Sequence, residues 1–281
     1  MMKIGYPCAN LTIGPIKDLF SKEEAEAIAV ENLACLARTL EFNEKAGLSF
    51  FAISPRLIPH QTLPDLVVEY SECLAAIGAY VKEKGMRIAA CPARAALAAE
   101  RRAADLAHLA SLLDAMGLDT TAKIPVRING RGEAESVAAS FCREYDALPE
   151  AVTRRLVIRN DRIHTVGDCC AVGQACGVPV AYDHHQAGGD PGEGVRECAL
   201  TWKSGDGAPI VFYGSLDPGV PHPQSVDPAA FRSFLAATAP AAREIDVMLL
   251  FKDRERSALT ARRVARDDLR LRGAPLMTVR H

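Results

Sequence analysis

The feature that most constrains the fold is a regular alternation of short apolar runs with longer segments of helical pattern along the whole chain. The short runs have the length of single strands, and the segments between them carry apolar residues at helical spacing. This rhythm is typical of stacked β-α units around a parallel sheet. The expected strands are 3–6, 50–53, 87–91, 122–128, 156–160, 179–183, 209–213 and 247–251.

Helices are expected between these strands. Ser21 followed by Glu24 predicts a capped helix start, and Gly85 predicts a helix end. The expected helices are 23–46, 66–85, 96–116, 133–145, 166–176 and 228–237. Eight strands in this rhythm predict a (β/α)8 TIM barrel formed by residues 1–281 as a single domain. An open doubly wound sheet is the alternative, but no G-x-G-x-x-G follows the first strand.

Composition narrows the functional class only modestly. The net charge of −2 gives no global sign of a nucleic-acid binder, although a local basic groove would still serve. The nine cysteines are scattered without a C-x-x-C pair, which argues against a zinc ribbon. No signal peptide and no run near the ~20 apolar residues of a membrane span is present. We therefore expect a cytoplasmic protein with reduced thiols and no membrane partner.

The C-terminal segment 252–281 is rich in arginine. One interpretation is a solvated helix and tail, and the other is an arm that contacts phosphate groups. The arginines are Arg254, Arg256, Arg262, Arg263, Arg266, Arg270 and Arg272.

Several motifs resemble those of the ultraviolet-damage DNA endonucleases. The chain opens with GYPC-x-NLT at residues 5–12, and LEFN at 40–43 and GLSFFAISPRLIP at 47–59 follow. Later matches are VPVAYD at 178–183, GSLDP at 214–218 with His222, and DVM at 246–248 with Lys252. The resemblance implies a TIM barrel of the apurinic-endonuclease and sugar-isomerase type. It also implies a DNA repair endonuclease that uses a cluster of divalent metal ions to cut DNA 5′ to a lesion.

The chain departs from that family at many of the metal and lesion positions. Cys91 stands at a metal-binding His, and Arg94 and Ala95 stand at the Gln-Tyr pair that wedges into the duplex. Further replacements of metal-site residues are Arg127 for a His, Arg159 for a bridging Glu, Leu250 for a Glu, and Ile210 and Phe212 for a Lys and a His. By the same resemblance, Tyr6, Asn10 and Asn160 are expected to face DNA, and Lys252 is a candidate catalytic residue.

The candidate metal ligands that remain are Asp183, His184, His185 and His222. Adjacent histidines on one strand point to opposite faces, so only one of the pair could share an ion with Asp183. Each arginine near such an ion opposes it by about 4 kcal/mol per unit of ionic charge at 4 Å and an effective dielectric near 20. We therefore expect at most one divalent ion, Mn²⁺ or Zn²⁺, instead of a cluster.

Three arginines are expected to converge on one ligand. Arg94, Arg127 and Arg159 end three successive strands, and guanidinium groups suit a phosphate or carboxylate. Three hypotheses stay open. The protein is a degenerate homologue that binds nucleic acid or a phosphorylated metabolite without metal, an endonuclease with a single-metal site, or a scaffold whose arginines pair with Asp161 and Asp183.

Overall fold

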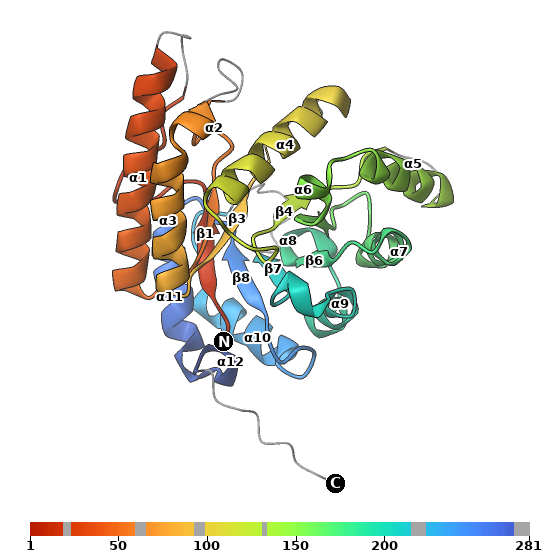
Figure 1. Cartoon of the computed structure of the whole chain (residues 1–281). Helices are drawn as coiled ribbons and strands as arrows, with labels where there is room; N and C mark the ends of the chain where they lie inside the picture. The colour runs from red at the N-terminus through yellow and green to blue at the C-terminus, as the bar shows by residue number, and fades with distance from the viewer. Residues whose placement is uncertain (19–23, 60–65, 93–98, 131–133, 215–222, 273–281) are drawn as a thin grey trace.

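The computed structural model describes residues 1–18, 24–59, 66–92, 99–130, 134–214 and 223–272. Its strands form a nearly closed parallel barrel with helices around the outside (Figure 1). The strands are β1 (Ile4–Pro7), β2 (Phe50–Ile53), β3 (Arg87–Ala90), β4 (Ile124–Val126), β5 (Leu156–Arg159), β6 (Val180–Asp183), β7 (Ile210–Tyr213) and β8 (Asp246–Leu249). The predicted TIM barrel is confirmed, and each of the eight expected strands overlaps an observed one.

The strands follow the spatial order β3-β2-β1-β8-β7-β6-β5-β4. Between β3 and β4 the ring is closed by an isolated bridge from Ala89 to Lys123, with the Ala90 N–H donating to the Lys123 carbonyl at 2.9 Å. Because the strands are parallel, their carboxyl ends lie together at one end of the barrel, which we call the mouth. We call the opposite end the floor.

The helices differ from the expected ones in one interruption and in several additional short helices. The expected helix 66–85 is interrupted at Tyr70, where the backbone (φ −95°, ψ 20°) leaves the helical conformation. An additional helix, α9, has Asp190 as its N-cap and Pro191 in its first turn. Ser21 lies outside the described residues. The helices are α1 (Ala25–Ala46), α2 (Leu66–Glu69), α3 (Ser71–Glu83), α4 (Ala99–Ala115), α5 (Ala134–Asp146), α6 (Glu150–Thr153), α7 (Val166–Cys176), α8 (His184–Ala187), α9 (Pro191–Ala199), α10 (Pro228–Thr238), α11 (Glu255–Val264) and α12 (Leu269–Arg272).

The arginine-rich C-terminal segment packs against the barrel over its described part. Arg270 is 5% exposed, pairs with Asp268 at 2.7 Å and donates to the Leu235 carbonyl. Arg262 donates to the carbonyl of Gly47 at the end of α1. At these two arginines the segment is therefore built into the fold, and residues 273–281 lie outside the description.

Two apolar layers form the core. Alternate residues of each strand point inward, and the others pack under the helices. The inward side chains are apolar and fill the barrel: Phe50, Ala52, Ala89, Val157, Ala181, Ile210, Phe212 and Met248. The interior is therefore a packed core that leaves the mouth as the place where side chains can meet a ligand.

Buried charges close the floor. Arg87, at the start of β3, pairs with Asp246 at 2.7 Å and donates to three backbone carbonyls. Lys123 is 1% exposed and pairs with Asp206 at 2.6 Å. Burial lowers the pKa of Lys123, although Asp206 opposes the shift. Each of these charges has a partner, as buried charges require.

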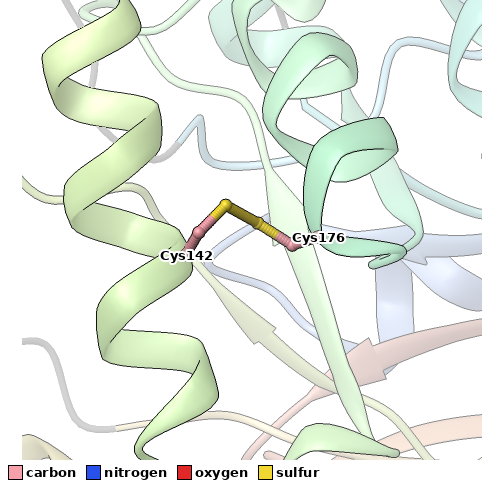
Figure 2. Close-up of a disulfide and its surroundings, with 2 residues drawn as sticks. All are labelled: Cys142 and Cys176. Carbon is pink, nitrogen blue, oxygen red and sulfur yellow. A yellow bond between two sulfur atoms is a disulfide. The ribbon is translucent and has the colours of Figure 1, made fainter.

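A disulfide joins Cys142 of α5 to Cys176 at the end of α7, with their Cα atoms 5.8 Å apart (Figure 2). The expectation of reduced thiols throughout is therefore wrong for this pair. The two residues are 34 positions apart, so their proximity is a product of the fold and not of sequence spacing. Among the helices that are described, none is long and apolar enough to cross a membrane.

Candidate functional site

The mouth is centred on an ion pair between Arg159 and Asp183, at the ends of β5 and β6. Nε and Nη2 of Arg159 lie 2.7 Å and 2.5 Å from Oδ2 of Asp183. Asp183 is fully buried, and its Oδ1 accepts the His185 backbone N–H at 3.1 Å. The Arg159 guanidinium also lies 4.1 Å from the Phe212 ring centroid, which adds a cation–π contact. Arginine therefore occupies the space beside the one buried carboxylate at the end of β6.

Asn160 fixes the geometry of this pair. Its Oδ1 accepts the Asp183 backbone N–H at 2.6 Å, and its Nδ2 donates to the Asp183 carbonyl at 3.2 Å. The side chain is fully buried, so it joins the ends of β5 and β6 instead of facing solvent. Asp161 accepts the backbone N–H groups of Ile163 and His164 and holds the following loop. Of the two pairings in the scaffold hypothesis, the structure contains the one with Asp183.

The two adjacent histidines were expected on one strand, but they begin helix α8 directly after β6, and their rings have different surroundings. The His184 ring stacks on Tyr213 at 5.2 Å and lies 5.0 Å from Phe234 of α10, so it packs between the barrel and its outer helices. Burial lowers the pKa of His184 to about 4, although Asp183 opposes the shift. His185 is also buried and sits against Gly214, where an added Cβ would lie 3.1 Å from the His185 Cβ. His184 therefore lies within an aromatic cluster.

These residues do not fit a cluster of divalent ions. Across the ranges described, no group of three or more His, Cys, Asp or Glu side chains could hold a metal. Both oxygens of Asp183 already accept hydrogen bonds, and the group beside it is a cation. His222, the fourth predicted ligand, lies outside the described residues.

Tyr6 and Asn10 form a buried network at the end of β1. The Tyr6 hydroxyl donates to Asn43 Oδ1 and accepts from Asn10 Nδ2, both at 2.7 Å. The Asn10 Oδ1 accepts two backbone N–H groups of the next turn. Burial raises the pKa of Tyr6 well above its usual range. The hydroxyl and the amide predicted to face DNA are thus engaged within the protein.

Glu255 of α11, which sequence reasoning missed, holds the same turn from the other side. Its carboxylate accepts the N–H groups of Leu11 and Thr12 and the Thr12 hydroxyl at 2.9–3.0 Å. No local signal would have found it, because it lies 243 residues from Thr12 in the sequence. The GYPC-x-NLT turn is therefore fixed by a carboxylate from the far end of the chain.

The other predicted site residues are more exposed or not described. Arg127 follows β4 with an exposed side chain, and its carbonyl accepts from Arg102 at 2.8 Å. Lys252 follows β8 and is exposed. Arg94 lies outside the described residues, so the predicted convergence of three arginines stays a prediction.

Comparison with known proteins agrees with this fold. The family model described as UV-endonuclease UvdE matches residues 9–270. The UV DNA damage endonuclease of Clostridium perfringens (strain 13 / Type A) is 27% identical over 243 residues, which are 77% of this chain and 59% of that protein. The homologous enzyme of Bacillus mycoides (strain KBAB4) is 23% identical over 64% of this chain and 62% of its own length. The chain thus spans about three fifths of the length of these curated relatives.

Solved structures give the same result. The crystal structure of SacUVDE superposes with a TM-score of 0.84 at 28% identity and covers 95% of this chain and 99% of its own. Endonuclease IV from Thermus thermophilus, at 19% identity and a TM-score of 0.55, covers 85% of this chain and 95% of its own and shares the fold. The closed ring of parallel strands and these similarities define a TIM-barrel protein. The chain belongs to the UV-endonuclease UvdE family.

Proposed function

We propose that this protein is a UvdE-family member that binds DNA at the barrel mouth without the multi-metal incision expected of the family. The observation that carries the proposal is the Arg159–Asp183 pair, which puts a fixed positive charge beside the buried carboxylate. A guanidinium neutralises Asp183 there and favours phosphate over a divalent ion. The proposed location is the cytoplasm.

The exposed part of Arg159 is the structural basis for anion binding. The side chain keeps 18% of its surface exposed while Asp183 has none. Arg127, on the neighbouring strand end, is exposed and adds a second positive charge. Phosphate contacts of this kind give affinity that falls steeply with salt and carries little sequence information. The proposed partner is therefore the DNA backbone, bound without a resident metal.

The test measures binding and cutting of the same DNA. Binding is measured by fluorescence anisotropy of a labelled duplex, with and without an ultraviolet lesion. A chelator should leave the affinity unchanged, and the logarithm of the binding constant should fall linearly with the logarithm of the salt concentration. Arg127→Ala should reduce that slope by about one, as loss of a single phosphate contact does. The matched control is Arg243→Ala, because Arg243 is also exposed but lies at the floor before β8.

Cutting of DNA by the same protein samples would contradict the proposal. Manganese-dependent nicking that is lost in Asp183→Asn would support the hypothesis of a single-metal endonuclease. The ligands to examine would then be Asp183, His185 and His222. If the protein neither binds nor nicks DNA, the scaffold hypothesis is the one that remains. Binding of a phosphorylated metabolite that competes with DNA and is weakened by Arg127→Ala would change the ligand but keep the anion site.

A further inference from the structure

Two thiols meet at the mouth, at the ends of the two strands that flank β2. Cys8 follows β1 and Cys91 follows β3, and both bond to the strand between them. The Cys8 N–H donates to the Ala52 carbonyl at 2.8 Å, and the Cys91 N–H donates to the Ile53 carbonyl at 3.0 Å. Inward side chains from alternate barrel strands share a layer, so these two converge. Their side chains are hydrogen-bonded to each other.

The surroundings of this pair are cationic and partly open. The bond to Cys8 and burial raise the pKa of the Cys91 thiol well above its usual range, and the nearby charges of Arg159 and Arg254 oppose that shift. Arg254 reaches the pair by donating to the Pro7 carbonyl at 3.3 Å, next to Cys8. Both thiols keep part of their surface accessible. A small ion could therefore reach the two sulfurs, and positive charge is present to offset the deprotonated form.

The backbone at this place is held in an uncommon conformation. Cys8 has φ 69° and Arg254 has φ 49°, and these are the two non-glycine residues with positive φ among the parts of the chain described. Each such residue costs on the order of 1–3 kcal/mol unless its surroundings fix it. Here the two positions are linked, because Arg254 donates to the carbonyl of Pro7, the residue before Cys8.

A second thiol pair in the molecule provides the contrast. Cys170 of α7 and Cys198 of α9 are also hydrogen-bonded to each other, but they are buried at 3% and 2% exposure. The bond to Cys170 and burial raise the pKa of the Cys198 thiol well above its usual range, and the carboxylate of Glu197 adds to the shift. This pair has neither access nor positive charge to support a thiolate. The same two functional groups therefore differ in chemistry because of their place in the fold.

We propose that Cys8 and Cys91 form a two-thiolate site for a soft monovalent metal ion of the Cu(I) class. Thiolate sulfur selects such ions over hard divalent cations. Binding replaces the two thiol protons: two R–SH groups and one Cu⁺ give one [Cu(SR)2]⁻ and two H⁺, with no oxidant needed. The net negative charge of the complex is offset by Arg159 and Arg254. The site shares Arg159 with the DNA-binding proposal, but its ligands are the two sulfurs, so copper binding and DNA binding are measured separately.

The test is anaerobic titration of the whole protein with Cu(I) against a competing chelator. The native chain should retain about one Cu(I), and Cys8→Ser or Cys91→Ser should weaken its affinity at least ~100-fold. Cys170→Ser, and Cys73→Ser at an exposed lone thiol, are the matched controls and should change nothing. X-ray absorption of the copper form should show sulfur ligands that disappear in Cys91→Ser. The proposal is overturned if the native chain cannot take Cu(I) from the chelator. It is also overturned if Cu(I) affinity is lost in Cys170→Ser and kept in Cys8→Ser and Cys91→Ser.

A measurement on the unmutated chain guards against misfolded variants. Alkylation with iodoacetamide, mapped by mass spectrometry, should label Cys8, Cys91 and Cys73 in the metal-free protein. One equivalent of Cu(I) should then protect Cys8 and Cys91 while Cys73 stays labelled. Equal labelling of Cys8 and Cys91 with and without Cu(I) contradicts the site.

Discussion

The two ends of the barrel each carry a buried arginine–aspartate pair, but the pairs are built differently. At the floor, Arg87 is 5% exposed and bonds to Asp246 and to three backbone carbonyls. At the mouth, Arg159 bonds to Asp183, lies over the Phe212 ring and keeps 18% of its surface exposed. The floor guanidinium is enclosed by acceptors, whereas the mouth guanidinium has an open side.

The comparison separates structural charge from charge available to a ligand. A guanidinium whose donors are satisfied inside the fold stabilises the closed end of the barrel and can do little else. A guanidinium that shares one carboxylate and faces solvent can accept a second anion. The chemical groups are identical, so residue type alone cannot tell these roles apart.

The largest expected effect is at the floor. Arg87→Ala leaves Asp246 buried without its partner, and loss of one member of a buried pair costs about 3–5 kcal/mol. Urea denaturation should show this loss in the free energy of unfolding. The double variant Arg87→Met with Asp246→Leu should recover most of it, since an apolar pair needs no charge partner. A loss below about 1 kcal/mol in Arg87→Ala would remove the structural role of the floor pair.

The next effect is a pH dependence of the free energy of unfolding, caused by His184 directly after β6. The pKa of His184 is lowered to about 4 in the folded state, so between pH 6.5 and 4 the unfolded chain binds more protons. Stability from this group is present above pH 6.5 and is lost as the pH falls toward 4, by about 3 kcal/mol. The free energy of unfolding measured across this range should therefore fall with pH. In His184→Phe, which keeps an aromatic ring against Tyr213, that contribution should vanish; an unchanged profile would contradict the assignment.

A smaller effect compares the two arginines directly. Arg159→Lys keeps the charge beside Asp183 in a site open to water and should cost about 1–2 kcal/mol. Arg87→Lys gives up several enclosed hydrogen bonds and should cost about 3 kcal/mol, at roughly 1 kcal/mol for each bond. Thermal and urea unfolding of both variants tests the order. Equal losses would mean that the mouth pair is as enclosed as the floor pair.

The smallest effect is expected at Lys252. Its side chain is exposed, so Lys252→Ala should change the free energy of unfolding by no more than about 0.5 kcal/mol. DNA affinity should also stay within about twofold of the native value, because the proposed contacts come from the ends of β4 and β5. A strong loss of DNA affinity without loss of stability would place the candidate catalytic lysine in the site.

The sequence allowed most of the barrel to be predicted, because its strands are short, apolar and regularly spaced. The end of α1 at Gly47 and the whole of α7 followed from local patterns of the same kind. The break at Tyr70 was not predictable, since the flanking residues continue a helical pattern. Helix α9 was missed although Asp190, Pro191 and Glu193 give a local start signal.

The candidate site was less predictable because its contacts join distant segments. Asp183 and Arg159 were placed at neighbouring strand ends from sequence, and the structure brings them together. The meeting of Cys8 with Cys91 across β2, and of Cys142 with Cys176 between helices, depends on three-dimensional packing that spacing does not encode. Glu255 shows the same limit, since its partners lie at the opposite end of the chain.

The bridge between Ala89 and Lys123 gives the ring a seam. Every other neighbouring pair of strands shares a ladder, whereas β3 and β4 meet at this bridge. On the floor side, Arg87 of β3 donates to the carbonyl of Thr121, which precedes β4. A side chain therefore joins the two strands where backbone pairing is sparse. On heating, β3 and β4 should therefore separate first at the mouth, while Arg87 still holds them together at the floor. Amide hydrogens along this line should exchange in a gradient, slowest beside Arg87 and fastest toward Arg127.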